Sequence, residues 1–419
     1  MDRALSNASR SAAPAAICLI LGALPTFMVL HDGVTRAAPN DALWSMPLPV
    51  VTTLLAVIVI AARSGDPRAV FVVDPSARLL GLVGLGLVAW AFCLLPIRAV
   101  VPAYGVIRLA ELALVAALAV ALAGAIRSHG ARFARSLLSA FVFGMCFAMP
   151  LLACARLMEW PTGYGELDVP GFAHIRILGF ALALALACAG GLWSENRARP
   201  ALFLAMAALS TALFWSGGRG ALAGLVLPLA VLASVLPALR KGCLPLAAAL
   251  LIGATAAWFI ETGAHQLGLG RRLTELGGSA DALTSGRLGM WQTLLAALAD
   301  APMLGLGAAQ SHWIFADAGH SVAHVHAHNS LLDTALALGW PGTVIAAITV
   351  IALWWRWLAR ARATGSSCHA AGIALVSVFL AISLVDGVYV YWPGLVPFAI
   401  GAAVLAGIER SAEPQSRSN

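Results

Sequence analysis

The sequence predicts an all-α membrane protein that crosses the bilayer many times. Of its 419 residues, 61% are hydrophobic and only 11% are charged, and the mean hydropathy is +0.88. This composition excludes an ordinary soluble domain and a disordered chain. Backbone polar groups in lipid must bond within their own segment, so the repeated apolar runs are expected to be helices. We therefore expect one helical domain over residues 1–419.

Apolar runs of spanning length recur about 12 times along the chain. When both termini are placed in the cytoplasm, most of the 26 Lys and Arg residues fall on the cytoplasmic side, as the positive-inside rule requires. The first run is too long for a cleavable signal peptide and is expected to remain as an anchor. The expected spans are 14–31, 46–62, 79–96, 105–126, 134–155, 172–192, 199–216, 219–237, 243–262, 338–357, 368–386 and 391–408.

One long segment, roughly 263–337, separates the ninth and tenth spans, and the alternation of charge places it in the periplasm. Ser285 is suited to cap a helix over RLGMWQTLLAALAD, which Pro302 and the following glycines end. Apolar residues at helical spacing predict that this helix lies along the membrane surface or over the bundle. The expected apolar face comprises Leu288, Trp291, Leu295 and Leu298.

The chemistry of the chain is expected in the next stretch, HSVAHVHAHNSLLDTALALGWPG, which begins at His320. A short helix is predicted from Asn329 to Leu338, where Gly339 and the Pro-Gly pair after it break the helix. His328 then stands at a helix N-terminus. Such a place offers exposed backbone N–H groups and the positive end of a helix dipole, both suited to anions.

The histidines also allow a metal site to be considered. His320, His324, His326 and His328 could supply ligands from an extended segment. However, the chain has no HExxH motif, and its 7 cysteines show no CxxC spacing. We therefore expect no metal and no cofactor, and interpret His326 as a residue that orients a neighbour or packs in the loop.

Arginines on the outer side of the bundle are informative, because topology does not require them there. Arg176 falls inside the sixth span, so its side chain is expected to face the protein interior or a wet cavity. Arg108 precedes Glu111 by three residues, which predicts an ion pair within one helix. The others are Arg36, Arg98 and Arg156, interpreted as headgroup contacts or snorkelling side chains, and Arg219, Arg271, Arg272 and Arg287.

Three motifs together resemble those of bacterial O-antigen ligases. His328-Asn329 is followed after nine residues by Gly339, and after two more by Gly342. Ser216-Gly217-Gly218-Arg219-Gly220-Ala221-Leu222 is similar to the family's arginine at the outer start of a span. Ser285-Gly286-Arg287 and then Pro302-Met303-Leu304-Gly305-Leu306-Gly307 resemble its periplasmic-loop arginine and Pro-x-x-Gly-x-Gly segment. The chain departs from the pattern at Gly218, where relatives often have serine.

The resemblance implies a GT-C type glycosyltransferase of the bacterial inner membrane. Such an enzyme moves an O-antigen polysaccharide from undecaprenyl diphosphate to a sugar hydroxyl of lipid A-core on the periplasmic side, with no cofactor and no nucleic-acid partner. His328 is then the expected general base, because histidine titrates near neutrality. Arg219 and Arg287 are expected to stabilise the leaving diphosphate. The remaining residues expected to bind substrate are Arg176, His326, Asn329, Arg271 and Arg272.

Other functions fit parts of the same pattern. An O-antigen polymerase would use a second lipid-linked repeat as acceptor, and a protein O-oligosaccharyltransferase would use a serine of a pilin. A transporter would also have glycine-rich spans, but its ionisable groups usually lie near the midplane of broken helices. Here they gather on one outer face, which favours the ligase. A single displacement with one base predicts inversion at the anomeric carbon.

Overall fold

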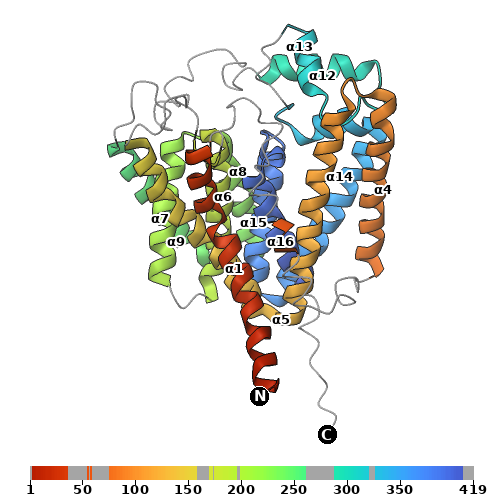
Figure 1. Ribbon diagram of the computed structural model, residues 1–419. Coiled ribbons are helices and arrows are strands. Elements are labelled where there is room, and N and C mark those ends of the chain that lie inside the picture. The colour runs from red at the N-terminus through yellow and green to blue at the C-terminus, as the bar shows by residue number, and fades with distance from the viewer. Residues whose placement is uncertain are drawn as a thin grey trace.

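The computed structural model describes residues 2–35, 54–55, 57–58, 75–157, 169–172, 174–195, 199–260, 287–319 and 326–408, and all regular structure within these ranges is helical. The long helices run side by side as a bundle (Figure 1). In chain order they are α1 Asp2–Thr35, α4 Pro75–Arg98, α5 Pro102–Leu157, α6 Ile175–Leu192, α7 Arg199–Ser216, α8 Arg219–Val235, α9 Pro237–Phe259, α12 Arg287–Ala299, α13 Ser311–Asp317, α14 Ser330–Thr364, α15 Ser367–Ser383 and α16 Trp392–Gly407.

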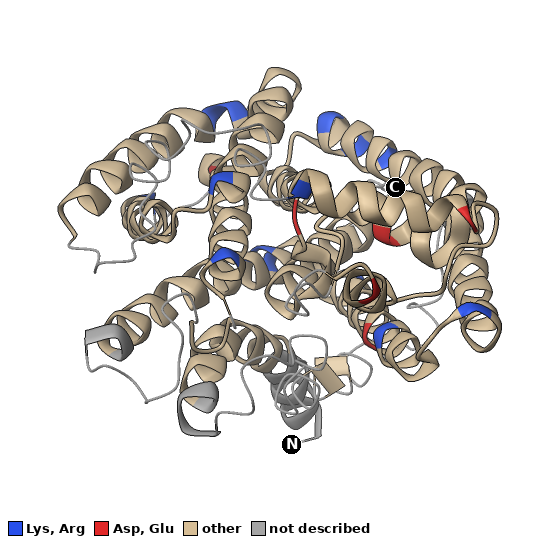
Figure 2. Cartoon of the chain, turned by 90° about the horizontal axis from the view of Figure 1, so that it is seen from above, with Lys and Arg blue, Asp and Glu red and all other residues tan. Residues whose placement is uncertain are grey.

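The helices support a polytopic membrane protein. Among the described residues, six helices are long and apolar enough to cross a bilayer, and four shorter ones are also apolar. Figure 2 shows how few charged residues interrupt the bundle. The expected span 199–216 coincides with α7, whereas 105–126 and 134–155 both lie in α5, which is broken at Gly130 (φ 78°). The expected span 46–62 lies almost wholly outside the described residues.

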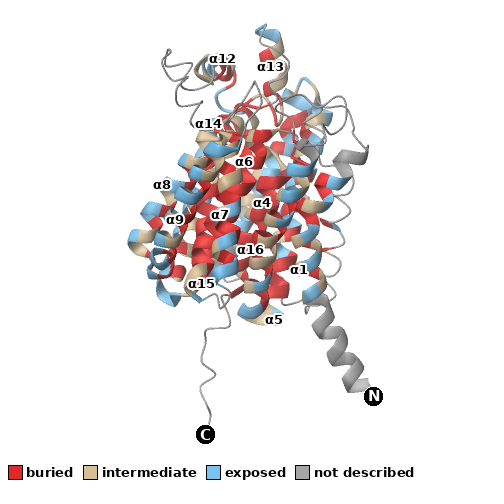
Figure 3. Ribbon diagram, turned by 90° about the vertical axis from the view of Figure 1, so that its left-hand side faces the viewer, coloured by how far each residue is buried: buried red, intermediate tan, exposed pale blue. Residues whose placement is uncertain are grey.

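Helix α6 forms the centre of the bundle. Nearly all of its residues are buried, and Figure 3 shows the buried residues concentrated inside while exposed ones face outward on α8 and α9. Small residues allow the neighbouring helices to approach closely. A Cβ at Gly191 would lie 2.3 Å from Ala371 Cα of α15, and one at Gly242 of α9 would lie 2.0 Å from Gly190 O.

A second hydrophobic core covers one end of the bundle. We call this unit the roof: α12, α13 and residues 326–338, which lie together in Figure 1. The helix predicted over RLGMWQTLLAALAD is confirmed as α12, but its predicted apolar face is partly wrong. Leu295 is 44% exposed, whereas Met290, Leu294 and Leu298 are buried against Phe315 of α13. The face is rotated because α13 and α14 pack on the side where Met290 lies.

The predicted break at Gly339 is also confirmed, and its cause is a loop that inserts there. Gly339 has φ 70° and ψ 177°, so α14 is interrupted between Leu338 and Trp340. The N–H group of Trp340 donates to Pro302 O (2.8 Å). Leu336 O accepts from the N–H groups of Leu306 (2.6 Å) and Gly307 (3.0 Å). The Pro-x-x-Gly-x-Gly loop thus satisfies the backbone groups that the break releases.

We expect Gly339→Ala to destabilise the protein by about 2 kcal/mol or more, because the left-handed region is costly for a residue with a Cβ. The added Cβ would also lie 2.3 Å from Met303 O and 2.8 Å from Leu304 N, which are backbone atoms of the packed loop. Thermal unfolding in detergent measures the effect. Gly289→Ala is the matched control, since a Cβ there meets nothing within 4 Å. Equal melting temperatures for wild type and Gly339→Ala would contradict this role.

Candidate active site

His328 occupies a conformation that its neighbours must enforce. Its φ is +51°, in the left-handed region, which costs a non-glycine residue about 1–3 kcal/mol. The next residue, Asn329, caps α14: its Oδ1 accepts from the N–H groups of Leu331 (3.0 Å) and Leu332 (3.1 Å). The predicted helix start is therefore confirmed. The cap fixes the chain direction at Asn329, and His328 makes the turn that leads into it.

The side chain of His328 meets a buried carboxylate that no motif predicted. Its Nδ1 lies 2.8 Å from Oδ1 of Asp386, which is 5% exposed and follows the end of α15. The other oxygen, Oδ2, accepts from Arg287 Nη2 (2.5 Å). Arg287 Nη1 also donates to Val385 O. Asp386 thus joins His328 and Arg287, two of the residues that the sequence singled out.

The protonation of this group follows from its surroundings. Burial alone would raise the pKa of Asp386, but the hydrogen bond from His328 and the positive charge of Arg287 lower it below the usual range. The carboxylate is therefore ionised at neutral pH and accepts from His328 Nδ1–H. In the neutral imidazole the lone pair is then on Nε2. This is the arrangement of a general base oriented by a carboxylate.

Two further arginines lie at helix starts beside the same segment. Arg219 is the first residue of α8, and the helix approaches the carboxylate so closely that a Cβ at Gly220 would lie 3.9 Å from Asp386 Oδ2. Arg176 lies in the first turn of α6, which begins at Ile175, and so falls near the start of the expected span 172–192. Its positive charge lies close enough to Tyr391 to interact electrostatically with the phenol group. The N-terminal ends of α6, α8 and α14 therefore surround residues 385–391.

Comparison with known families finds a similarity in the middle of the chain. Residues 202–347, from α7 to the middle of α14, match the family described as O-Antigen ligase. This segment of the chain is thus similar to the O-antigen ligase family. No curated protein matches it. The matched segment of the O-antigen ligase family contains Arg219, Arg287 and His328, but Asp386 lies beyond its end.

Two residues that support the site were missed or only partly foreseen, and both contact the segment 385–391. Arg108 forms the predicted pair with Glu111 (2.7 Å) and also donates to Val390 O (2.9 Å) and Tyr389 O. Asp333 accepts from the N–H of Ala327 (3.1 Å) and from the hydroxyl of Tyr389. Both residues tie the 385–391 segment to its neighbours.

Arg98 was interpreted as a headgroup contact, and that interpretation is incomplete. Its Nε donates to Gly305 O (3.3 Å), so it holds the Pro-x-x-Gly-x-Gly loop against the end of α4. The loop of the O-antigen ligase motif is thus fixed on two sides, by α4 and by the break in α14. Its contacts with α4 and α14 place the roof and, through α14, His328.

Several expected site residues lie outside the described part of the chain: Arg271, Arg272, His320 and His324. Asn329 is described, and its side-chain oxygen is used in the helix cap. Within the described ranges, no three His, Cys, Asp or Glu side chains are grouped so that they could hold a metal ion. Among the described residues, the candidate chemistry centres on His328, Asp386 and the arginines near them.

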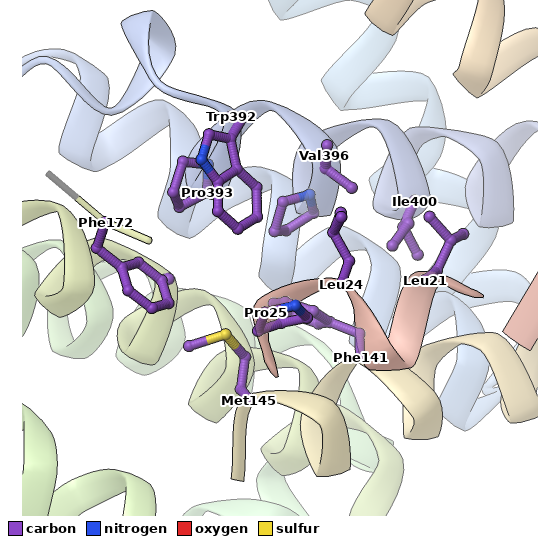
Figure 4. Close-up of a pocket in the computed structure, with 12 residues that line it drawn as sticks. Leu21, Leu24, Pro25, Phe141, Met145, Phe172, Trp392, Pro393, Val396 and Ile400 are labelled. Atoms are coloured by element: carbon purple, nitrogen blue, oxygen red, sulfur yellow. The ribbon is translucent and has the colours of Figure 1, made fainter. Parts of the chain in front are cut away.

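An apolar pocket adjoins the site (Figure 4). It is lined by side chains of α1, α5, α6 and α16, including Leu24, Met145 and Trp392. Trp392 directly follows Tyr391 in the chain and stacks on Phe172 with their ring centroids 5.9 Å apart. The polar segment thus borders an apolar part of the bundle interior.

Proposed function

We propose that this chain is an O-antigen ligase with a GT-C type architecture and about 12 spans. It transfers a polysaccharide from undecaprenyl diphosphate to a sugar hydroxyl of lipid A-core and thereby completes lipopolysaccharide. The proposal places it in the bacterial inner membrane with both termini in the cytoplasm and the loop 263–337 in the periplasm. The family match supports a glycan-assembly enzyme of this kind.

The observation that carries the proposal is the hydrogen bond between His328 and Asp386, because it supplies an oriented base. The acceptor hydroxyl attacks the anomeric carbon, and its proton passes to His328 Nε2. The bond between that carbon and the diphosphate oxygen breaks, and its electron pair leaves with undecaprenyl diphosphate. The Asp386 carboxylate stabilises the imidazolium that forms. This displacement inverts the anomeric centre.

The leaving diphosphate is stabilised by cationic groups at the helix starts. Arg219 and Arg287 are both candidates, and Arg287 uses two donors for Asp386 and Val385 O. A guanidinium has five N–H donors, so Arg287 can orient the carboxylate and still act on an anion. Arg176 is a third candidate. The N-terminal ends of α6, α8 and α14 add favourable dipoles, so that charge can be stabilised without a metal ion.

Arg219→Lys is expected to lower the transfer rate by about 10²-fold, because lysine cannot give paired hydrogen bonds to two phosphate oxygens. The measurement is product formation at saturating donor in proteoliposomes. Arg199→Lys provides the matched control: this arginine also begins a helix, α7, but it contacts Ser194 O at an exposed position. If both variants transfer at the wild-type rate, Arg219 has no part in binding the diphosphate.

Reconstitution tests the function itself. Purified protein in proteoliposomes receives lipid-linked glycan and purified lipid A-core, with and without EDTA, and the products are separated on a gel. The proposal predicts glycan on lipid A-core at the same rate in both conditions. Chain extension of the lipid-linked glycan would instead identify a polymerase, and transfer to a pilin serine a protein glycosyltransferase. Flux across the membrane without glycosyl transfer would identify a transporter.

A further inference from the structure

Both ring nitrogens of His326 are engaged in hydrogen bonds. Its side chain lies next to His328, with the two ring centroids 4.0 Å apart. The Nδ1 atom accepts from the backbone N–H of His328 (3.1 Å), and Nε2 lies 3.3 Å from the hydroxyl oxygen of Tyr391. Because Nδ1 accepts from an N–H group, the ring proton belongs on Nε2 and points to Tyr391. These two bonds are incompatible with His326 acting as a metal ligand.

The surroundings keep this ring neutral and fixed. His326 is 4% exposed, and its ring occupies the space where a Cβ of Gly387 would stand, 2.0 Å from Cε1. Burial, reinforced by His328 and by the charges of Arg108 and Arg287, lowers the pKa of His326 well below its usual value, although Asp386 opposes the shift. A neutral ring retains the lone pair that accepts from His328 N–H.

The bond from His328 N–H matters because of the backbone at that residue. His328 has φ +51°, in the left-handed region. There the Cα–Cβ bond points in a different direction, relative to the flanking chain, than it does in an extended residue. Without a partner for its N–H group, the chain can relax toward an ordinary conformation. The imidazole of His328 would then turn away from Asp386, which lies on a different element, after α15.

We propose that His326 is a positioning residue that holds His328 in its left-handed conformation through the bond between His326 Nδ1 and the His328 amide. This assignment replaces the expectation that His326 binds substrate, and it rests on the proposed role of His328 as the base. The His326 ring makes one hydrogen bond for each part of this role. Nδ1 fixes the backbone of His328, and Nε2–H anchors the ring to Tyr391 beside the start of α16.

Two substitutions separate this role from simple packing. In His326→Asn, Oδ1 can stand where Nδ1 stood and accept from the His328 amide, whereas His326→Leu fills the space without an acceptor. We expect the transfer rate at saturating donor to fall about 10²-fold in His326→Leu and less than about 10-fold in His326→Asn, with KM for the lipid-linked donor unchanged in both. A packing role predicts the opposite order, so higher activity in His326→Leu than in His326→Asn overturns the proposal.

Controls keep this test independent of the proposed function. Melting temperatures in detergent show whether each variant folds, and His326→Asn decides alone if His326→Leu does not: an Asn variant as inactive as His328→Ala overturns the inference. His312→Asn, on α13 of the roof, is expected to transfer at the wild-type rate. An inactive wild type refutes the proposed function. An active wild type with both His326 variants at the wild-type rate refutes only the positioning role.

Discussion

His328→Ala is expected to lower the rate of glycan transfer by about 10³-fold, the contribution typical of a positioned general base. The imidazole is the group that takes the acceptor proton, and the methyl group of alanine cannot accept one. The remaining contacts to the donor, made by the arginines and helix starts, are unaffected. The rate should therefore fall at saturating substrate while KM for the donor stays close to that of the wild type.

The measurement is a single-turnover time course in proteoliposomes with labelled lipid-linked glycan. His312→Ala serves as the control, because this histidine also lies in the roof but contacts Trp313 of α13 and not Asp386. Both variants should insert and melt like the wild type. A transfer rate in His328→Ala within a few-fold of the control would remove His328 from the chemistry.

Asp386→Asn is also expected to lower the rate of glycan transfer about 10³-fold. The His328 imidazole loses its orientation and the charge that stabilises it when the carboxylate becomes an amide. The substitution also removes the partner of Arg287. Asp300→Asn is the matched control, since this residue lies at the exposed end of α12. Activity of Asp386→Asn equal to that of Asp300→Asn would show that the carboxylate does not assist His328.

The depressed pKa of Asp386 predicts how the site responds to acid. Its charged form is stabilised in the folded protein relative to the unfolded chain, where the ordinary carboxyl pKa is about 4. The stabilisation is therefore complete above that pH and is lost only as the pH falls through the lower folded value. The carboxylate thus keeps its charge, and with it its bonds to His328 and Arg287, throughout the neutral and mildly acidic range.

The sequence predicted those features of the fold that depend on residues close together in the chain. The break at Gly339 and the helix start near Asn329 follow from residue types with strong backbone preferences, and both were predicted; the capping role of Asn329 was not. The pair between Arg108 and Glu111 was predicted because residues three apart share a helix face. The bundle itself follows from the apolar runs. Each of these depends on contacts within one element or on the solvent around it.

Asp386 could not be paired with His328 from spacing, because the two lie 58 residues apart and meet only through packing of α14 against α15. A signal was nevertheless present. Asp386 is the only acidic residue between Asp333 and Glu409, and it interrupts an otherwise apolar stretch. Ionisable residues at such positions are expensive and commonly functional. The face of α12 was missed for a similar reason, since its partner α13 is fixed by tertiary contacts.

A double-variant cycle on the transfer rate tests the central claim, that His328 and Asp386 act together as one base. Single-turnover rates are measured for the wild type, His328→Ala, Asp386→Asn and the double variant. If the carboxylate acts through the imidazole, the double variant should be no slower than His328→Ala alone. Two independent reductions that multiply to about 10⁶-fold in the double variant would contradict the account.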